Sequence, residues 1–144
     1  MNIDVFPNGM KLSVVIPIYN EEKTLSEIVA KVQATPYDKE LILVDDCSTD
    51  TSREVMKALQ EQYDNIRCFY HKKNLGKGGG LATGFAETTG DVVLIQDADL
   101  EYDPADYPVL LRPILEGKAD VVFGSRFLGG AYARVHLFYH YLGN

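Results

Sequence analysis

Short runs of apolar, mostly β-branched residues recur at fairly even intervals along the chain. They cover residues 12–18, 41–44, 66–70, 92–95 and 121–123. Continuous apolar runs of this length are typical of strands that are covered on both faces, as they are in a parallel sheet. The pattern therefore predicts five strands in a buried sheet.

Apolar residues at helical spacing occupy the intervals between these runs. The clearest stripes cover residues 25–32, 55–59 and 107–115. Asn20 is placed to cap the first of these helices, whereas Pro113 lies inside the last and predicts a kink or an early end. Residues 76–89 are predicted to be a glycine-rich loop that leads into a short helix.

Strand and helix alternate along the chain, which predicts an α/β domain with a mostly parallel central sheet flanked by helices. With 144 residues, the chain has the length of one domain. Gly129 and Gly130 mark a change of character, because aromatic and basic residues crowd together after them. We therefore expect residues 1–128 to form one domain and residues 129–144 to begin a further segment that the end of the chain cuts short.

The composition is that of a soluble globular protein, since hydrophobic residues make up 46% of the chain and charged residues 24%. The formal net charge of −7 leaves no overall basic field that would attract nucleic acid. No apolar run approaches the roughly 18 residues of a membrane-spanning helix, and the first residues lack the apolar core of a signal peptide. Cys47 and Cys68 have no metal-binding or redox spacing, which suggests a reducing compartment. The sequence therefore predicts a soluble, acidic, cytoplasmic protein.

Polar side chains gather where the predicted strands end. Residues 17–21 follow the first strand, 45–48 the second, 96–99 the fourth and 124–126 the fifth. Ligands of open α/β sheets bind outside the carboxyl ends of the strands. Carboxylates, hydroxyls and an arginine are therefore expected to converge at one edge of the sheet.

Asp97 and Asp99 stand within residues 78–111, a stretch that contains no Lys or Arg. On an extended backbone the two carboxylates share a side, roughly 7 Å apart, and their repulsion costs about 2 kcal/mol. No cation nearby in the sequence offsets this repulsion. A bound Mg²⁺ or Mn²⁺ would offset this repulsion. Mg²⁺ completes its coordination with water and substrate phosphates. The pair therefore indicates a phosphorylated substrate; its alternative is a solvated acidic loop, which the spacing alone supports equally well.

Three common ligand-binding motifs do not fit the acidic and glycine-rich segments. A calcium-binding EF-hand loop that starts at Asp97 would need Gly at Tyr102 and Glu at Pro108. A phosphate-binding P-loop would need Ser or Thr directly after Lys77, and no Gly-x-Gly-x-x-Gly turn for a dinucleotide follows the first strand. The glycines of residues 76–80 more simply allow close approach to a ligand or a neighbouring strand. Lys77 is then either a ligand contact or a surface charge.

Five segments, in this order and at this spacing, resemble the family-2 glycosyltransferases. They are residues 14–21, 43–50, 74–78, 96–99 and 124–126, within a resemblance that extends over about residues 11–128. Residues 97–104 and 124–127 are most similar to the branch of the family that uses a polyprenyl phosphate, dolichyl or undecaprenyl, as acceptor. The resemblance implies a Rossmann-like GT-A domain that binds a nucleotide sugar. Residues 129–144 would then begin an acceptor-side or membrane-proximal segment.

The resemblance also implies which residues bind the nucleoside. They are Pro17, Tyr19, Asn20, Glu21, Val44 and Asp46. Pro17, Tyr19 and Glu21 would line the pocket with Asn20 nearby, whereas Val44 and Asp46 would meet the base or the ribose. Simpler alternatives are that Pro17 ends a strand and that Asp46 caps a turn.

At the diphosphate end, Asp97, Ala98 and Asp99 would hold the metal and the diphosphate of the donor. Arg126 would face phosphate, for which a planar guanidinium is suited; its alternative is an ion pair with the acidic loop. The candidate catalytic residues are Asp97, Asp99 and Arg126, and the candidate ligands of Mg²⁺ or Mn²⁺ are Asp97 and Asp99.

The implied reaction moves a hexose from a UDP- or GDP-linked sugar to a polyprenyl phosphate, with inversion at the anomeric centre and with a metal that neutralises charge on the leaving group. A phosphate acceptor needs little deprotonation, because its second pKa is about 6 and it is largely anionic at pH 7. An alternative is a family-2 transferase that acts on a polysaccharide or glycan hydroxyl, whose carboxylate base is expected beyond the end of this chain. Another is a donor-binding fragment without turnover.

The resemblance extends to partners and location. A position at the cytoplasmic face of a membrane is expected only for the full-length protein, in line with polyprenyl-phosphate enzymes of the family. Self-association into a homo-oligomer is compatible with an apolar C-terminal end. The implied biological role is cell-wall or glycan biosynthesis, and the donor sugar and its base stay open.

Overall fold

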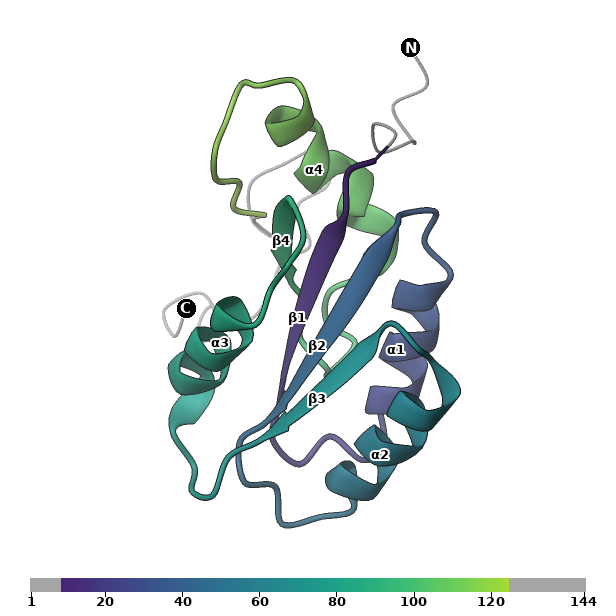
Figure 1. The fold of residues 1–144 in the computed structure, drawn as a ribbon, viewed down its shortest axis with the longest axis vertical. Coiled ribbons are helices and arrows are strands. Elements are labelled where there is room, and N and C mark those ends of the chain that lie inside the picture. The colour runs from purple at the N-terminus through teal and green to yellow at the C-terminus, as the bar shows by residue number, and fades with distance from the viewer. Residues whose placement is uncertain (1–8, 125–144) are drawn as a thin grey trace, which may run out of the picture. The chain divides into compact units, whose positions relative to one another are not determined.

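The computed structural model describes residues 9–124 of the chain. Its elements are β1 (Leu12–Ile18), α1 (Leu25–Gln33), β2 (Lys39–Asp45), α2 (Ser52–Gln62), β3 (Ile66–Tyr70), α3 (Gly76–Ala86), β4 (Val92–Ile95), the 3₁₀ turn η1 (Pro104–Asp106) and α4 (Tyr107–Leu115). The strands form one sheet in the order β3-β2-β1-β4, and every neighbouring pair is parallel (Figure 1). The predicted α/β architecture with a mostly parallel sheet is therefore confirmed.

β1 and β2 form the centre of the sheet and are covered on both faces. Six of the seven residues of β1 are buried, and so are six of the seven of β2. Pro17 lies opposite Val44 and Ile18 opposite Asp45, so the two strands end together. β4 runs beside β1 in the same direction. The segments that follow β1, β2 and β4 therefore emerge at the same edge of the sheet.

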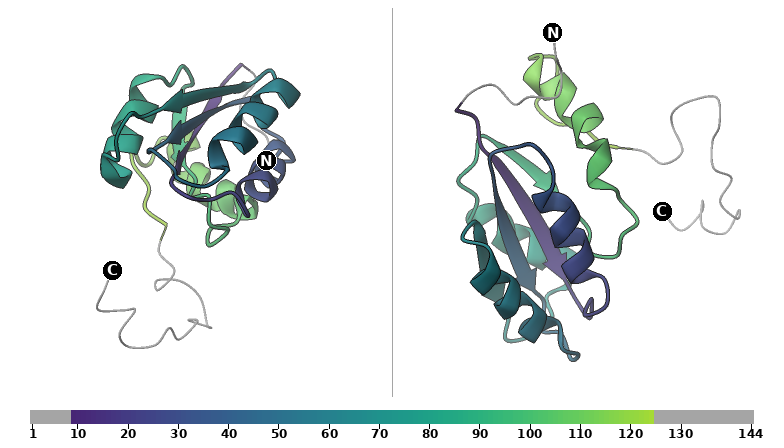
Figure 2. Two further views of the ribbon diagram at one scale, coloured as in Figure 1. Left: turned by 90° about the horizontal axis from the view of Figure 1, so that it is seen from below. Right: turned by 90° about the vertical axis from the view of Figure 1, so that its right-hand side faces the viewer.

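Helices cover both faces of the sheet, with α1 and α2 on one face and α3 on the other (Figures 1 and 2). The buried side of α1 consists of Leu25, Ile28, Val29 and Val32. On the α3 face, Val15, Ile42 and Val44 form a fully buried cluster, against which Leu81 and Phe69 pack. Within residues 9–124, no helix is long and apolar enough to cross a membrane.

α3 begins earlier than the sequence predicts, because the glycine-rich segment is itself helical from Gly76 onward. Glycine costs about 1 kcal/mol relative to alanine inside a helix, so local propensity favours a loop here. Packing against β1 overrides this propensity. A Cβ on Gly84 would overlap Val15, and a Cβ on Gly80 would touch Pro17 at 3.5 Å. The predicted close approach to a neighbouring strand is thus present, and it brings the first turn of α3 to the end of β1.

The fifth predicted strand, residues 121–123, is not a strand in the structure. Val121 is 66% exposed and Phe123 is 91% exposed. An apolar run becomes a strand only when a neighbouring strand satisfies its backbone hydrogen bonds, and in the described part of the chain none pairs with these residues. The prediction is therefore wrong for this segment.

α4 runs through Pro113 and ends at Leu115. The Lys118 N–H donates to the Pro113 carbonyl and the Gly117 N–H to the Ile114 carbonyl, both at 2.9 Å. Gly117 has a φ of +67°. This is a Schellman cap, in which a glycine in the left-handed region closes the helix. Pro113 therefore does not shorten the helix, which covers the whole predicted stripe of residues 107–115 and is closed by Gly117.

Candidate functional site at the carboxyl edge of the sheet

A cavity of about 330 Å³ lies at the carboxyl ends of β1, β2 and β4 and beside the first turn of α3. Its lining residues are Pro17, Ile18, Tyr19, Glu21, Asp46, Asn74, Gly76, Lys77, Gly80, Asp97, Ala98 and Asp99. Parallel strands bring their carboxyl ends to one edge, which is where ligands of open α/β sheets bind. The cavity is thus a candidate ligand site with carboxylates from the segments that follow three strands.

Most of the residues predicted to bind a ligand line this cavity. They are Pro17, Tyr19, Glu21, Asp46, Asp97, Ala98 and Asp99. Val44 does not, because its side chain is fully buried in the cluster with Val15 and Ile42. Arg126, like the whole of residues 125–144, lies outside the described residues. The structure therefore brings Asp97 and Asp99 to one cavity, and the predicted Arg126 lies outside the described residues.

Asn20 joins two loops and does not cap α1, whose N-cap position is Thr24. Its side-chain oxygen accepts the Thr49 N–H at 2.8 Å and the Asp50 N–H at 3.3 Å. Its own N–H donates to the Ser48 hydroxyl at 3.0 Å. Asn20 adopts a φ of +55°, which asparagine tolerates better than most residues. Asn20 therefore holds the loop after β2 against the loop after β1.

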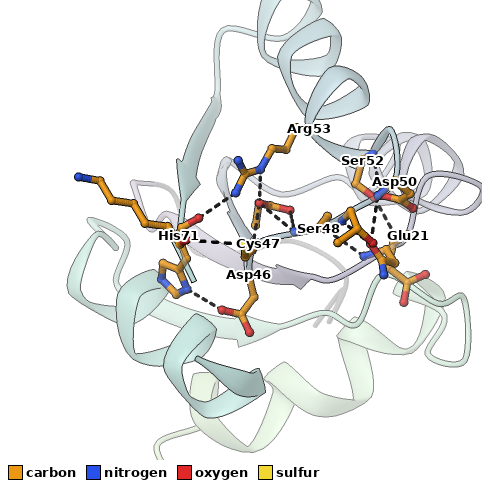
Figure 3. Close-up of polar contacts among 12 residues, drawn as sticks. Glu21, Asp46, Cys47, Ser48, Asp50, Ser52, Arg53 and His71 are labelled. Carbon is orange, nitrogen blue, oxygen red and sulfur yellow. Dashed lines mark hydrogen bonds and ion pairs between the residues drawn. The ribbon is translucent and has the colours of Figure 1, made fainter. Parts of the chain in front are cut away.

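The loop after β2 is held from its other side by Asp45, which is fully buried. The Asp45 carboxylate accepts Nε–H of Arg53 at 2.6 Å and the Cys47 N–H at 3.2 Å. The hydrogen bond from Arg53 to Asp45 raises the pKa of the guanidinium. Arg53 also donates to the carbonyl of His71 at 2.8 Å, which ties this loop to the end of β3 (Figure 3). The Asp45 carboxylate is therefore occupied by hydrogen bonds within the protein and has a structural role.

Asp46 is the buried carboxylate that faces the cavity, and it is held by residues that lie far along the chain. One of its oxygens accepts the Leu75 N–H at 2.7 Å and lies 2.8 Å from Nδ1 of His71 (Figure 3). Nε2 of His71 lies 2.8 Å from the Thr83 hydroxyl. Burial by itself would raise the pKa of Asp46, but the hydrogen bonds from His71 and from the backbone at Leu75 and Gly76 outweigh it and lower this pKa. Asp46 is thus an ionised and oriented acceptor.

His71 supports the site through Asp46, and the sequence pattern does not single it out. It is the first residue after β3, and the third predicted strand is the one whose end contributes none of the candidate residues. Its position is the signal that could find it, because ligands of parallel sheets lie at strand ends.

Asp97 is paired with Lys77, which lies just outside the stretch without Lys or Arg, residues 78–111. Nζ of Lys77 lies 2.7 Å from each oxygen of the Asp97 carboxylate. No local pattern indicates this pair, because Lys77 is 20 residues away and on a different element. Its position follows from the close packing of α3 on β1. The repulsion between Asp97 and Asp99 is therefore reduced by a charge that only the fold supplies.

The loop after β4 is supported by Gln96, a buried side chain. Its amide nitrogen donates to the carbonyls of Asp97 and Tyr102, both at 3.0 Å. Its oxygen accepts the Tyr107 hydroxyl at 2.7 Å. Within the loop, Asp99 accepts the Glu101 N–H at 3.0 Å. The backbone that carries Asp97 and Asp99 is therefore defined by hydrogen bonds.

Two carboxylates on one cavity wall fit a hard divalent cation that arrives with a phosphorylated ligand. In the described residues, no group of three or more His, Cys, Asp or Glu side chains is arranged to hold a metal ion. Mg²⁺ commonly takes only one or two protein carboxylates and completes its coordination with water and phosphate oxygens. The oxygen donors of Asp97 and Asp99 suit such an ion, which would compete with Lys77 for Asp97.

Comparison with known proteins finds a matching family and curated relatives. Residues 13–133 match the family described as Glycosyl transferase family 2. The chain is 34% identical over 137 residues to a dolichol-phosphate mannosyltransferase of Pyrococcus furiosus. The matched segment covers 92% of this chain and 38% of the relative. It is 37% identical over 112 residues to an undecaprenyl-phosphate 4-deoxy-4-formamido-L-arabinose transferase of Salmonella enteritidis, with 74% of this chain and 34% of that relative covered. The chain thus spans little more than a third of the length of these relatives.

Solved structures also match the fold of the chain. A mannosyltransferase of Pyrobaculum calidifontis in complex with GDP-Man and Mn²⁺ matches with a TM-score of 0.60 and 26% identity, over 66% of this chain and 29% of the other. Glucosyl-3-phosphoglycerate synthase of Mycobacterium tuberculosis, in complex with Mn²⁺, UDP and glucosyl-3-phosphoglycerate, matches with a TM-score of 0.59 and 31% identity, over 74% of this chain and 40% of the other. Both neighbours contain a nucleotide and a divalent metal.

Proposed function

The chain belongs to glycosyltransferase family 2, and from this premise we propose that it is the donor-binding part of an enzyme that transfers a hexose from a nucleoside diphosphate sugar to a polyprenyl phosphate. Its parallel α/β fold is that of the GT-A glycosyltransferases among its structural neighbours. Because the chain spans only part of its relatives, the activity is proposed for the whole protein.

The observation that carries the proposal is the cavity that is lined by Asp46 and by the Asp97–Asp99 pair. An ionised, buried carboxylate such as Asp46 accepts hydrogen bonds from a base or a ribose. A pair of carboxylates attracts a divalent cation and, through it, a diphosphate. The two features match the two halves of a nucleoside diphosphate.

In this proposal Pro17, Tyr19, Glu21 and Asp46 form the nucleoside end. Tyr19 is half-exposed at the cavity, where its ring offers a flat apolar surface to a base. Asn20 supports this end from the loop that it holds, and Val44 supports it from the core behind Asp46. Guanine and uracil are both proposed as the base, since the structural neighbours include complexes with GDP-Man and with UDP.

At the diphosphate end, Asp97 and Asp99 would hold Mg²⁺ or Mn²⁺, with Ala98 between them. When bound, the cation supplies charge neutralisation for the departing nucleoside diphosphate. The Mn²⁺ in the neighbouring mannosyltransferase and synthase complexes supports a divalent ion here. Arg126 is proposed to face phosphate.

The proposed acceptor is a polyprenyl phosphate, supported by the two relatives, which are named for dolichol phosphate and undecaprenyl phosphate. A phosphate monoester is largely anionic at pH 7, because its second pKa is about 6. It can therefore attack the anomeric carbon in line with the leaving group, and with inversion, without a protein base. A polysaccharide or glycan hydroxyl is the alternative acceptor and would need such a base.

Calorimetric titration of the chain with UDP and with GDP, each with Mn²⁺ and with chelator, tests the donor site. We expect one nucleotide to bind in a Mn²⁺-dependent manner. Asp99→Asn should remove the Mn²⁺-dependent part of the affinity, at least about tenfold, because a coordinating charge is lost. Asp64→Asn, an exposed acid in the turn before β3, is the charge-matched control and should change nothing.

A folded chain that binds neither nucleotide would contradict the donor proposal, and an Asp99→Asn variant with unchanged Mn²⁺ dependence would contradict the metal assignment. The acceptor is tested separately with the full-length protein, by transfer of labelled sugar to undecaprenyl phosphate or to a glycan. Transfer to the glycan alone would favour the hydroxyl alternative.

A further inference from the structure

Lys77 occupies the position at Asp97 that a divalent cation would need. Nζ lies 2.7 Å from both carboxylate oxygens, so the ammonium spans the carboxylate symmetrically. The Lys77 side chain is 59% exposed and the Asp97 side chain 18% exposed. The pair is therefore at the surface of the cavity, where a partner can be exchanged without unfolding anything.

The backbone around Lys77 leaves its side chain free to move. The Lys77 side chain is largely exposed, and its glycine neighbours at 76 and 78 carry no side chain that would confine it. The lysine stem is long and flexible and carries a compact charge. Nζ can thus move several ångströms while α3 stays packed on β1.

A diphosphate in the cavity would offer Lys77 a second partner. Lys77 and Asp97 line the same cavity, together with Gly76 and Gly80 of α3. A cation bound between Asp97 and Asp99 would repel the ammonium, whereas the phosphate oxygens that accompany this cation would attract it. Binding of the cation at Asp97 and movement of Lys77 to the diphosphate therefore favour each other.

We propose that Lys77 is a donor-binding residue that exchanges partners: it neutralises Asp97 as long as no cation is bound and moves to the diphosphate when cation and nucleotide enter together. The proposal rests on the function proposed above. It makes the site bind the cation weakly by itself and strongly with the nucleotide. The shared counter-ion is thus the source of cooperativity between the two ligands.

The test is the binding of Mn²⁺ alone, measured by electron paramagnetic resonance, to the unaltered chain and to Lys77→Met. Removing the competing ammonium should tighten binding of Mn²⁺ alone by about threefold or more, the size of an exposed ion-pair effect. Lys73→Met, an exposed lysine in the loop just before α3, is the matched control and should bind Mn²⁺ like the unaltered chain. Unchanged or weaker Mn²⁺ binding by Lys77→Met would overturn the proposal.

The second measurement uses UDP or GDP, whichever the unaltered chain binds more tightly, in the presence of saturating Mn²⁺. Lys77→Met should bind this nucleotide about tenfold more weakly, because a charged contact with phosphate is lost. In an Asp97→Asn background, Lys77→Met should no longer tighten the binding of Mn²⁺ alone, since the exchanged partner is absent. An equal effect in both backgrounds would overturn the exchange.

The outcomes separate this inference from the function on which it rests. An unaltered chain that binds no nucleotide with Mn²⁺ contradicts the donor site as a whole. An unaltered chain that binds both ligands, with a Lys77→Met variant that behaves identically, contradicts only the role of Lys77.

Discussion

At the scale of single residues, the Asp46 carboxylate is held from both ends of the loop that joins β3 to α3. The Leu75 N–H and the His71 ring lie 2.7 and 2.8 Å from the same oxygen. The carboxylate stays ionised because these hydrogen bonds lower its pKa more than burial raises it. Position after β2 makes Asp46 a candidate in the sequence. Its protonation state and orientation depend on His71 and Leu75, which are distant in the sequence.

Asp46→Ala should weaken binding of the bare nucleoside as well as of the nucleotide. A charged hydrogen bond contributes roughly 1.5–3 kcal/mol, so we expect a loss of about tenfold or more for both ligands. Calorimetric titration with uridine or guanosine and with the matching diphosphate measures the two losses.

Asp64→Ala is the control for this substitution, because Asp64 is exposed and lies in the turn between α2 and β3. A variant of Asp46 that binds the nucleoside normally and only the nucleotide weakly would exclude a role at the base or ribose.

At the scale of elements, α3 is the helix that assembles the site. It supplies Lys77 and Gly76 to the cavity and Thr83 to His71. It can do so because Gly80 and Gly84 let it lie directly against β1. Local propensity opposes this helix, and burial against the sheet stabilises it.

Gly84→Ala should destabilise the protein by about 1–3 kcal/mol, because the new Cβ would overlap Val15. Gly78→Ala is the matched control in the same helix, since a Cβ there meets no atom within 4 Å. It should stabilise the protein by about 0.5–1 kcal/mol through helix propensity alone. Urea unfolding measures both, and equal effects of the two substitutions would contradict the packing argument.

At the scale of the whole molecule, the carboxyl and amino edges of the sheet differ in their structure. The carboxyl edge carries the cavity, whereas the amino edge is closed by Glu40, which is only 5% exposed. Its carboxylate accepts the Ser13 hydroxyl and the Thr89 N–H, both at 2.6 Å. Arg67 and Lys11 add charge at 3.2 and 3.5 Å. Glu40 thus links β1, β2, β3 and the segment before β4.

This network predicts a loss of stability in acid. Burial by itself would raise the pKa of Glu40, but the hydrogen bonds from Ser13 and Thr89 outweigh it and lower the pKa from 4.5 to about 2. A carboxyl whose pKa is lowered on folding stabilises the protein above its unfolded pKa, so this contribution is complete above pH 4.5 and is lost as the pH falls toward 2. It amounts to about 3 kcal/mol.

Thermal unfolding between pH 6 and pH 2.5, to be measured on the unaltered chain and on Glu40→Gln, checks this contribution. Glu40→Gln should be less stable at pH 6 and should lose less stability on acidification. Glu61→Gln, an exposed glutamate near the end of α2, is the control. The same pH slope in all three proteins would show that Glu40 does not contribute.

Much of the architecture follows from the sequence by itself. The apolar runs at residues 12–18, 66–70 and 92–95 are strands with the predicted bounds, and residues 41–44 lie within β2. Burial on both faces of a parallel sheet requires continuous apolar runs, so the pattern is visible locally. The order of strand ends also places Asp46, Asp97 and Asp99 at one edge, because parallel strands share a direction.

The tertiary structure decided which side chains meet at that edge. The pairs Lys77–Asp97 and His71–Asp46 join residues that are 20 and 25 positions apart. The first depends on how α3 packs, and the second on the pairing of β2 with β3. Residues 121–123 have the composition of a strand and lack a paired neighbour in the described part of the chain. The pattern of apolar and polar residues shows which side chains of each segment are buried. Ion pairs and strand pairing depend on which segments become neighbours in the fold. The sequence therefore determined the elements and the edge, and the packing of a glycine-rich helix together with the pairing of β2 with β3 decided the charges within the site.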